Sequence, residues 1–135
     1  MCRFSTLKGG GKLKRFVVAV GLLAGVLCLA AKGPLRTLVQ THGLKDYGLT
    51  GSLPSYLCVI SLSLLFCAVR WKKGQGAIYS TITAIVTGSL LYEFFSFSTV
   101  RVFDWADVLA IVAGGLTSII VVRFALAKED NHAVD

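Results

Sequence analysis

Residues 53–97 read LPSYLCVISLSLLFCAVRWKKGQGAIYSTITAIVTGSLLYEFFSF, and this segment alone indicates the architecture. It holds two apolar runs, 53–69 and 77–97, joined by a short basic turn. Unbroken apolar runs of this length are typical of transmembrane helices, whereas the strands of a membrane barrel alternate apolar and polar residues. Because the turn is short, the two helices are expected to be antiparallel neighbours. The segment therefore predicts a transmembrane helical hairpin.

Two further apolar runs, 16–31 and 108–127, lie on either side of this hairpin. The remaining ends are a basic tail, 1–15, and a polar tail, 128–135. Of the 135 residues, 55% are hydrophobic and only 16% are charged, against about 25% charged in a typical soluble domain. The sequence therefore predicts one integral membrane domain over 1–135. We expect an all-α fold, an antiparallel four-helix transmembrane bundle, and the low charge argues against an ordinary soluble enzyme.

The first apolar run, with 16 residues, is shorter than the span of about 20 that a bilayer needs. Either it is a cleaved signal peptide, or it is a retained helix whose flanking Lys14, Arg15 and Lys32 reach the interface. Cys28 or Leu29 would stand where a signal peptidase prefers a small residue, which favours retention. After it, Pro34 begins either a short surface helix or a kinked continuation of the first helix.

Basic residues predict the orientation, because Lys and Arg collect on the cytoplasmic side of membrane proteins. The side that carries the N-terminus has nine of them: Arg3, Lys8, Lys12, Lys14, Arg15, Arg70, Lys72, Lys73 and Lys128. The other side has four: Lys32, Arg36, Lys45 and Arg101. Both termini are therefore expected inside (N-in/C-in). Because the net charge of +7 lies beside apolar runs, we expect no nucleic-acid partner.

Small residues recur every fourth position in the last two runs, which places each set on one helical face. Small faces let transmembrane helices approach closely. We therefore expect the third and fourth helices to pack through two sets of residues: Ser80, Ala84 and Gly88 on one, and Ala106, Ala110, Gly114 and Ser118 on the other. Gly21 and Gly25 form a further GxxxG pattern in the first helix, for which homodimerisation is an alternative use.

The cysteines and histidines give no pattern of a metal or redox site. No two of the four cysteines, Cys2, Cys28, Cys58 and Cys67, have the close spacing of a zinc or thiol-redox motif. Those inside apolar runs are expected to be small buried hydrophobes. The two histidines lie in a loop and in a tail, and the motifs of common hydrolases and phosphate loops are absent from the sequence. We expect no catalytic residue, no metal and no cofactor.

One group of charged residues stands at the outer ends of the third and fourth spans: Glu93, Arg101, Asp104 and Asp107. Ionisable groups inside a membrane are functional hypotheses by default, which predicts a ligand-binding site for a lipid headgroup, a proton or a small polar molecule. The structural alternative is capping. In that reading Asp104 is an N-cap, Asp107 is its partner three residues on, and Arg101 neutralises Glu93.

The segment from Tyr92 to Leu116, YEFFSFSTVRVFDWADVLAIVAGGL, resembles the VanZ-like family of small bacterial membrane proteins. That family has a Glu late in one span, an Arg-x-x-Asp-x-x-Asp connection and a later Gly, which Glu93, Arg101, Asp104, Asp107 and Gly114 match. Two amide positions of the pattern differ, being Ser96 and Ile111 here. Lys45-Asp46-Tyr47 is loosely similar to a neighbouring family of small membrane proteins. The resemblance implies a multi-pass protein of the bacterial cytoplasmic membrane.

These observations leave three classes of function. The first is a non-catalytic VanZ-like envelope protein that binds a lipid or polar ligand at its outer face. The second is an accessory subunit of a larger membrane complex, with a membrane protein or a second copy of the chain as partner. The third, an enzyme or a transporter, is the least favoured because the chain has one acidic residue within its spans and no catalytic motif.

Overall fold

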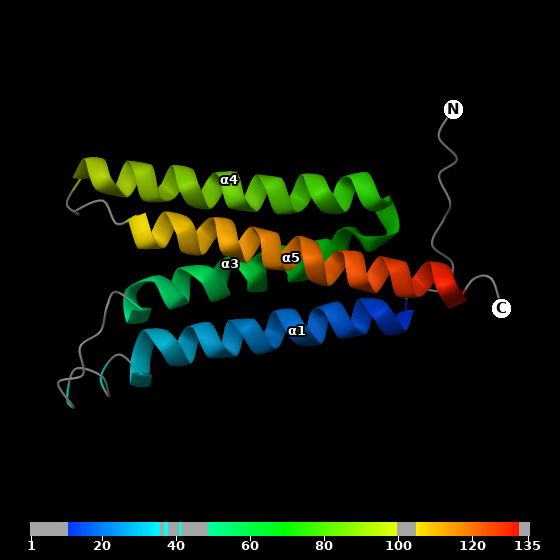
Figure 1. The fold of residues 1–135 in the computed structure, drawn as a ribbon, viewed down its shortest axis with the longest axis horizontal. Coiled ribbons are helices and arrows are strands. Elements are labelled where there is room, and N and C mark those ends of the chain that lie inside the picture. The colour runs from blue at the N-terminus through cyan, green and yellow to red at the C-terminus, as the bar shows by residue number, and fades with distance from the viewer. Residues whose placement is uncertain (1–10, 36, 38–40, 42–48, 100–104, 133–135) are drawn as a thin grey trace.

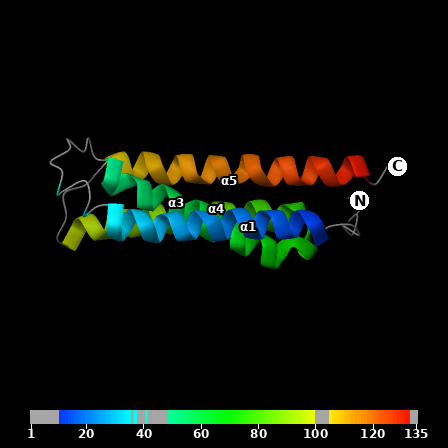
Figure 2. The same cartoon turned by 90° about the horizontal axis from the view of Figure 1, so that it is seen from below.

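The computed structural model describes residues 11–35, 37, 41, 49–99 and 105–132 of the chain. Within these ranges the fold is helical, with four long helices: α1 (Gly11–Ala30), α3 (Leu49–Arg70), α4 (Gln75–Thr99) and α5 (Trp105–His132). All four are long and apolar enough to cross a membrane. They lie side by side along one axis (Figures 1 and 2). The predicted all-α four-helix transmembrane bundle is therefore confirmed.

Each helix extends beyond the apolar run that predicts it. The expected basic tail 1–15 is helical from Gly11 onward, and the expected polar tail 128–135 is helical to His132. α3 begins at Leu49, four residues before the predicted run 53–69, and therefore contains Pro54 in its second turn. Helices extend in this way because the interface still favours internal backbone hydrogen bonds, while long basic side chains reach water.

The connections differ in how tightly they turn. Between α3 and α4, a single turn of 3-10 helix, Trp71–Lys73, is followed by Gly74 at φ 91°, a backbone conformation that glycine adopts without strain. The Gly74 N–H then donates to the Trp71 carbonyl over 3.5 Å. α1 instead runs on into a wider π-helical turn, Ala31–Leu35, which contains Pro34. For these residues the structure favours continuation of the first helix.

α3 is the central helix and contacts α1, α4 and α5. Successive helices run antiparallel, so α3 and α5 run in the same direction and begin at the same end of the bundle (Figure 1). The first residues of α1 and the last turn of α5 lie together at the opposite end. The shared core contains the most buried large side chains: Val17, Leu64, Ile78, Ile82 and Val122.

α1 packs on α3 through the two glycines of its GxxxG pattern. A Cβ atom at Gly25 would lie 2.9 Å from the Ser61 Oγ, and one at Gly21 would lie 3.2 Å from the Leu64 Cβ. The glycines therefore allow the two backbones to approach closely inside one chain. This contact within one chain occupies the same face of α1, with Gly21 and Gly25, that homodimerisation would use.

The predicted packing of α4 on α5 through small residues is wrong for α4. Ser80, Ala84 and Gly88 are exposed, and a Cβ at Gly88 would meet no atom within 4 Å. α4 instead inserts Val86 beside Gly115, where an added Cβ would lie 2.5 Å from the Val86 Cγ2. The branched side chain of Val86 therefore occupies the space that a side chain at Gly115 would need.

On α5, the predicted small face is buried but contacts a different helix. Gly114 and Ser118 are buried, and Ala110 is half-buried. A Cβ at Gly114 would lie 2.9 Å from the Tyr56 carbonyl oxygen and 3.2 Å from the Val59 Cβ, both on α3. α5 therefore presents Gly114 to α3 and Gly115 to α4, and these adjacent glycines join three helices.

A hydrogen bond between side chains links α3 to α5. The Tyr56 hydroxyl lies 3.0 Å from the Thr117 Oγ1, and that Oγ1 donates to the Ala113 carbonyl over 2.9 Å, so Tyr56 is the donor to Thr117. We expect Tyr56→Phe to lower the free energy of unfolding by about 0.6 kcal/mol, the average for interhelical hydrogen bonds in a bilayer. Denaturation by SDS in mixed micelles measures this change. Tyr79→Phe, which removes a hydroxyl with no such bond among the described residues, should leave stability unchanged, and an equal loss in both variants would contradict the assignment.

Candidate functional site

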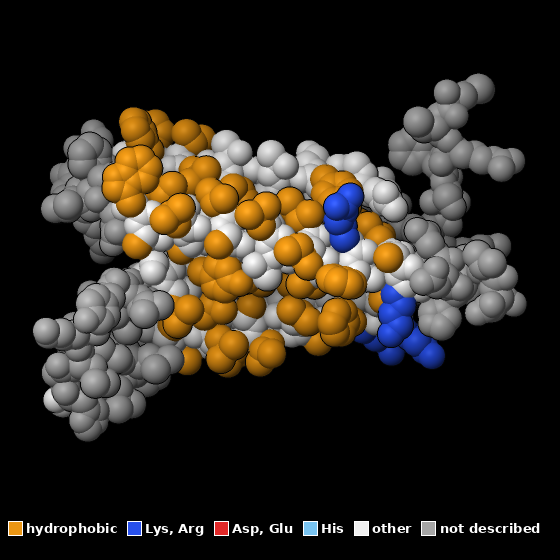
Figure 3. All heavy atoms as spheres, viewed as in Figure 1, with side chains coloured by type: hydrophobic (Ala, Val, Ile, Leu, Met, Phe, Trp, Pro, Cys, Tyr) orange, Lys and Arg blue, Asp and Glu red, His pale blue; other side chains and the backbone are white. Residues whose placement is uncertain are grey.

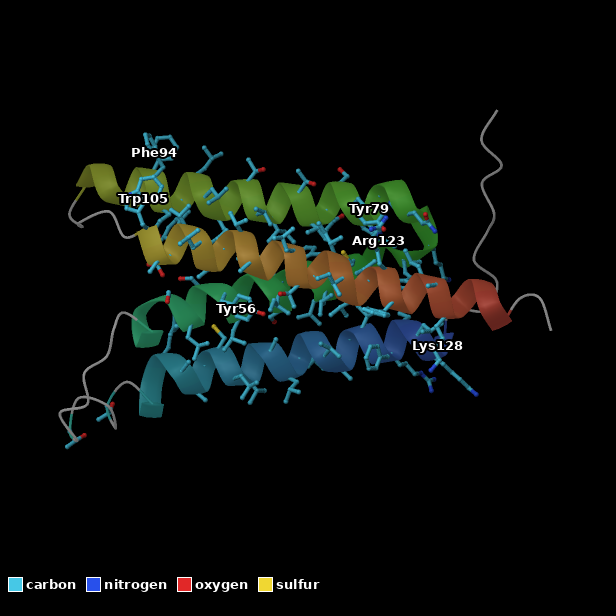
Figure 4. All side chains as sticks on the ribbon, in the orientation of Figure 1. Tyr56, Tyr79, Phe94, Trp105, Arg123 and Lys128 are labelled. Atoms are coloured by element: carbon cyan, nitrogen blue, oxygen red, sulfur yellow. The ribbon has the colours of Figure 1, made fainter. Side chains whose placement is uncertain are left out.

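The two ends of the bundle differ in charge. Most described basic residues belong to the start of α1, the end of α3 with the turn after it, and the end of α5: Lys12, Lys14, Arg15, Arg70, Lys72, Lys73 and Lys128. We call these residues the basic end. Figure 3 shows Lys and Arg side chains gathered at this end, and Figure 4 shows Lys128 there. The described acidic side chains, Glu93 and Asp107, lie near the opposite end, where Lys32 follows α1. The face between the ends is largely apolar (Figure 3). The concentration of Lys and Arg at one end agrees with the count from the sequence, and the side of the membrane that each end faces stays a prediction.

Asp107 continues the inward face of α5. It precedes a set of buried residues at helical spacing: Ile111, Gly114, Ser118, Val122 and Ala125. Since Gly114 lies against α3, Asp107, seven residues earlier, is on the side of α5 that faces the start of α3. It is in the first turn of α5, where the helix dipole favours a carboxyl group.

Glu93 occupies the matching place on α4. It is half-buried and follows the inward positions of that helix at helical spacing: Ile78, Ile82, Val86 and Ser89. The contact between Val86 and Gly115 sets the register of the antiparallel pair. Glu93 is seven residues after Val86 on α4, and Val108 is seven residues before Gly115 on α5. Glu93 is therefore level with Val108, the neighbour of Asp107. The two acidic residues therefore stand at one level of the bundle.

Asp107 also has an unsatisfied atom. Its Oδ1 is buried and has no hydrogen-bond partner among the described residues. Two other buried polar atoms share this property, the Ser63 Oγ and the Trp71 Nε1. Because an unpaired buried acceptor is unfavourable, the Asp107 Oδ1 is the acidic group here with spare capacity to accept a hydrogen bond from a ligand.

Exposed aromatic side chains of α4 and α5 lie at this level on the outside of the bundle. Phe94 and Trp105 are 64% and 70% exposed, and Figure 4 shows both at the end that carries Glu93 and Asp107. Phe94 also meets Phe95 edge to face at a centroid distance of 6.4 Å. Exposed aromatic residues at one level are typical of the boundary between hydrocarbon and headgroups. We therefore expect the two acidic residues to lie near headgroup depth.

Of the four predicted ligand-binding residues, the structure brings Glu93 and Asp107 to one level, while Arg101 and Asp104 lie outside the described residues. Among the described residues, no three His, Cys, Asp or Glu side chains gather as a metal site would require. Sequence reasoning missed the role of Gly115, although its Gly-Gly dipeptide with Gly114 was visible. It also missed a thiol pair, Cys28 and Cys58, because the two residues are thirty positions apart.

Comparison with protein-family models, with curated proteins and with solved structures found no match to this chain. The resemblance of the Tyr92–Leu116 segment to the VanZ-like family therefore stays a hypothesis.

Proposed function

We propose that this chain is a non-catalytic, VanZ-like membrane protein that binds a lipid headgroup at the level of Glu93 and Asp107. In this proposal the protein resides in a bacterial cytoplasmic membrane with both termini inside, so the headgroup site faces outward. The observation that supports the proposal is the Asp107 Oδ1 beside the start of α3, which is buried and has no hydrogen-bond partner in the part of the chain that the structure describes. A carboxyl oxygen kept without a partner in the fold is available to an incoming hydrogen-bond donor.

The chemistry of the site favours one kind of headgroup. Two carboxyl groups near headgroup depth call for a ligand that donates hydrogen bonds. The primary ammonium of phosphatidylethanolamine donates, whereas the quaternary ammonium of phosphatidylcholine has no N–H. We therefore expect the protein to retain phosphatidylethanolamine over phosphatidylcholine by about tenfold, the equivalent of one hydrogen bond to a charged group.

Replacing Asp107 tests the proposal against the capping alternative. We expect Asp107→Leu to raise the free energy of unfolding by up to about 1 kcal/mol, because removing a buried acceptor that has no partner among the described residues outweighs the loss of the helix-dipole interaction. A capping role predicts the opposite, a loss of about 1 kcal/mol. Denaturation by SDS measures the sign. A clear destabilisation would assign Asp107 to the helix end and contradict the ligand site.

The same variant tests binding directly. Native mass spectrometry of protein in micelles doped with equal amounts of the two lipids measures which lipid stays bound. Asp107→Leu should lose the preference for phosphatidylethanolamine. Lys128→Gln, at the basic end, is the matched control and should keep it. Equal retention of both lipids by the unaltered protein would refute the proposal.

A second candidate, an accessory subunit of a larger membrane complex, is favoured by one observation. The exposed face of α4 carries Ser80, Ala84 and Gly88 in one row, which no described helix covers. Rows of small residues are typical of helix–helix contacts in membranes. The native mass of the protein extracted in mild detergent distinguishes the two candidates. An accessory subunit purifies with another polypeptide in a fixed ratio. Gly88→Leu should then release that polypeptide.

A further inference from the structure

Two cysteines meet at the seam between α1 and α3. Along this antiparallel seam Gly21 contacts Leu65 and Gly25 contacts Ser61, so each step forward on α1 is matched by a step back on α3. Three residues beyond Gly25, this register places Cys28 opposite Cys58. The two side chains lie close enough to interact electrostatically. The pairing thus follows from the register of the helices as well as from the side chains.

The close approach of the two backbones at Gly25 favours a covalent link one turn away. A disulfide needs Cα atoms that are no more than about 7 Å apart, a separation that helices reach only where small residues line the contact. The Cβ that Gly25 lacks would lie 2.9 Å from the Ser61 Oγ. Both cysteines are free thiols in this structure. The seam therefore presents two reduced sulfur atoms about one turn from its close contact at Gly25.

The two thiols differ in access, as a reacting pair requires. Cys28 is 7% exposed, and its Sγ donates to the Pro54 carbonyl over 3.3 Å. Cys58 is half-buried, so a reagent dissolved in the lipid reaches it first. Cys67 is fully buried, and its Sγ faces the Ile78 carbonyl at 3.6 Å. Cys67 therefore serves as an internal control.

We propose that Cys28 and Cys58 form a redox-active dithiol that closes into a disulfide between α1 and α3 by exchange with an apolar disulfide oxidant. The Cys58 thiolate attacks one sulfur of the oxidant, forming a mixed disulfide and releasing one thiol equivalent. The Cys28 sulfur then attacks the Cys58 sulfur and releases the second equivalent. The protons lost by the two cysteines go to the two released thiols, so the protein is oxidised and the oxidant is reduced.

The closed form changes how firmly α1 is held. α1 packs mainly on α3, with a smaller contact to α5, so it is the helix that a single link affects most. A disulfide there joins residues 28 and 58, which restricts the unfolded chain and favours the folded one. We expect oxidation to raise the thermal midpoint by several degrees, and a reducing thiol to reverse the shift. This inference is independent of the headgroup site.

The test uses a Cys2→Ser background, which leaves the three cysteines of the helices, in detergent micelles with 4,4′-dipyridyl disulfide as the oxidant. We expect two thiopyridone molecules released per chain, a chain lighter by two hydrogens without an adduct, and a proteolytic peptide pair joined through Cys28 and Cys58. Cys67 should stay a thiol until SDS unfolds the chain, when its reaction shows that the reagent is active. Adding Cys58→Ser to this background should abolish the loss of two hydrogens.

Separate pyridyl adducts on Cys28 and Cys58 of one chain would overturn the proposal, because they show that the two sulfurs do not reach each other. A link between two chains, or one that includes Cys67, would overturn it equally. The proposal would also be overturned if all three thiols stayed unreacted in the folded protein but reacted fully after unfolding. The central measurement is made without altering either cysteine of the pair, so it does not depend on whether a variant folds.

Discussion

Gly114→Leu is expected to lower the free energy of unfolding by about 3 kcal/mol. A Cβ at this position would lie 2.9 Å from the carbonyl oxygen of Tyr56 and 3.2 Å from the Cβ of Val59. The first of these atoms belongs to the backbone of α3, so it cannot move aside as a side chain does. α5 would have to separate from α3, which also breaks the Tyr56–Thr117 hydrogen bond. Helical content and tryptophan fluorescence during an SDS titration measure the loss.

Gly88→Leu is the matched control for this variant, with the same change in a neighbouring helix. A Cβ at Gly88 would meet nothing within 4 Å, so the added side chain enters lipid and stability should stay within about 0.5 kcal/mol of the original. If Gly88→Leu were the more damaging variant, the small row of α4 would be a packing surface after all. If neither variant changed stability, the close contact of α5 with α3 would be refuted.

The number and type of the helices follow from the sequence alone, and the physical reason is the bilayer. Runs such as 108–127 are too long and too apolar for any other use, and a chain in lipid must satisfy its backbone within each helix. The short basic turn after 53–69 determines that α3 and α4 are antiparallel. These predictions depend only on local composition, and the structure confirms them.

The contacting faces could not be predicted in the same way. In a soluble helix, the apolar stripe shows which side is buried, but lipid is as apolar as the core, so hydropathy distinguishes the two sides weakly. Gly88 and Gly115 illustrate this, since both stand in small-residue patterns, yet one faces outward and the other receives Val86. What decides between them is the shape of the opposing helix, which a local pattern does not contain.

The candidate site was predictable in part for a related reason. A carboxyl group inside an apolar run is conspicuous, so Glu93 stands out in the sequence, and Asp107 stands out because it directly precedes the run 108–127. Their common level depends on the register of α4 on α5, which the contact between Val86 and Gly115 determines. Register also explains why the thiol pair of Cys28 and Cys58 escaped the sequence. Residues thirty positions apart meet only because two glycines align α1 with α3.

Leu64→Ala is the second substitution with a large expected effect, a loss of about 2 kcal/mol. Leu64 is fully buried on α3, and its Cβ would lie 3.2 Å from a Cβ added at Gly21 of α1. In a soluble protein, such a change costs about 2–5 kcal/mol, the sum of a transfer term and a cavity term. In a bilayer, the unpacked side chain stays in an apolar medium, so the transfer term largely cancels and the cavity term remains.

Leu62→Ala on the same helix isolates that cavity term. Leu62 is 40% exposed, so lipid chains fill the space that its truncation leaves, and the expected change in stability is close to zero. The difference between the two variants, measured by SDS titration of each, is therefore the free energy of an internal cavity alone. Equal losses would mean that lipid does not reach Leu62, and another helix, from a partner or a second copy of the chain, would have to cover that side of α3. A loss at Leu64 close to 5 kcal/mol would instead mean that unfolding transfers this side chain to water, contrary to a bundle that unfolds within an apolar phase.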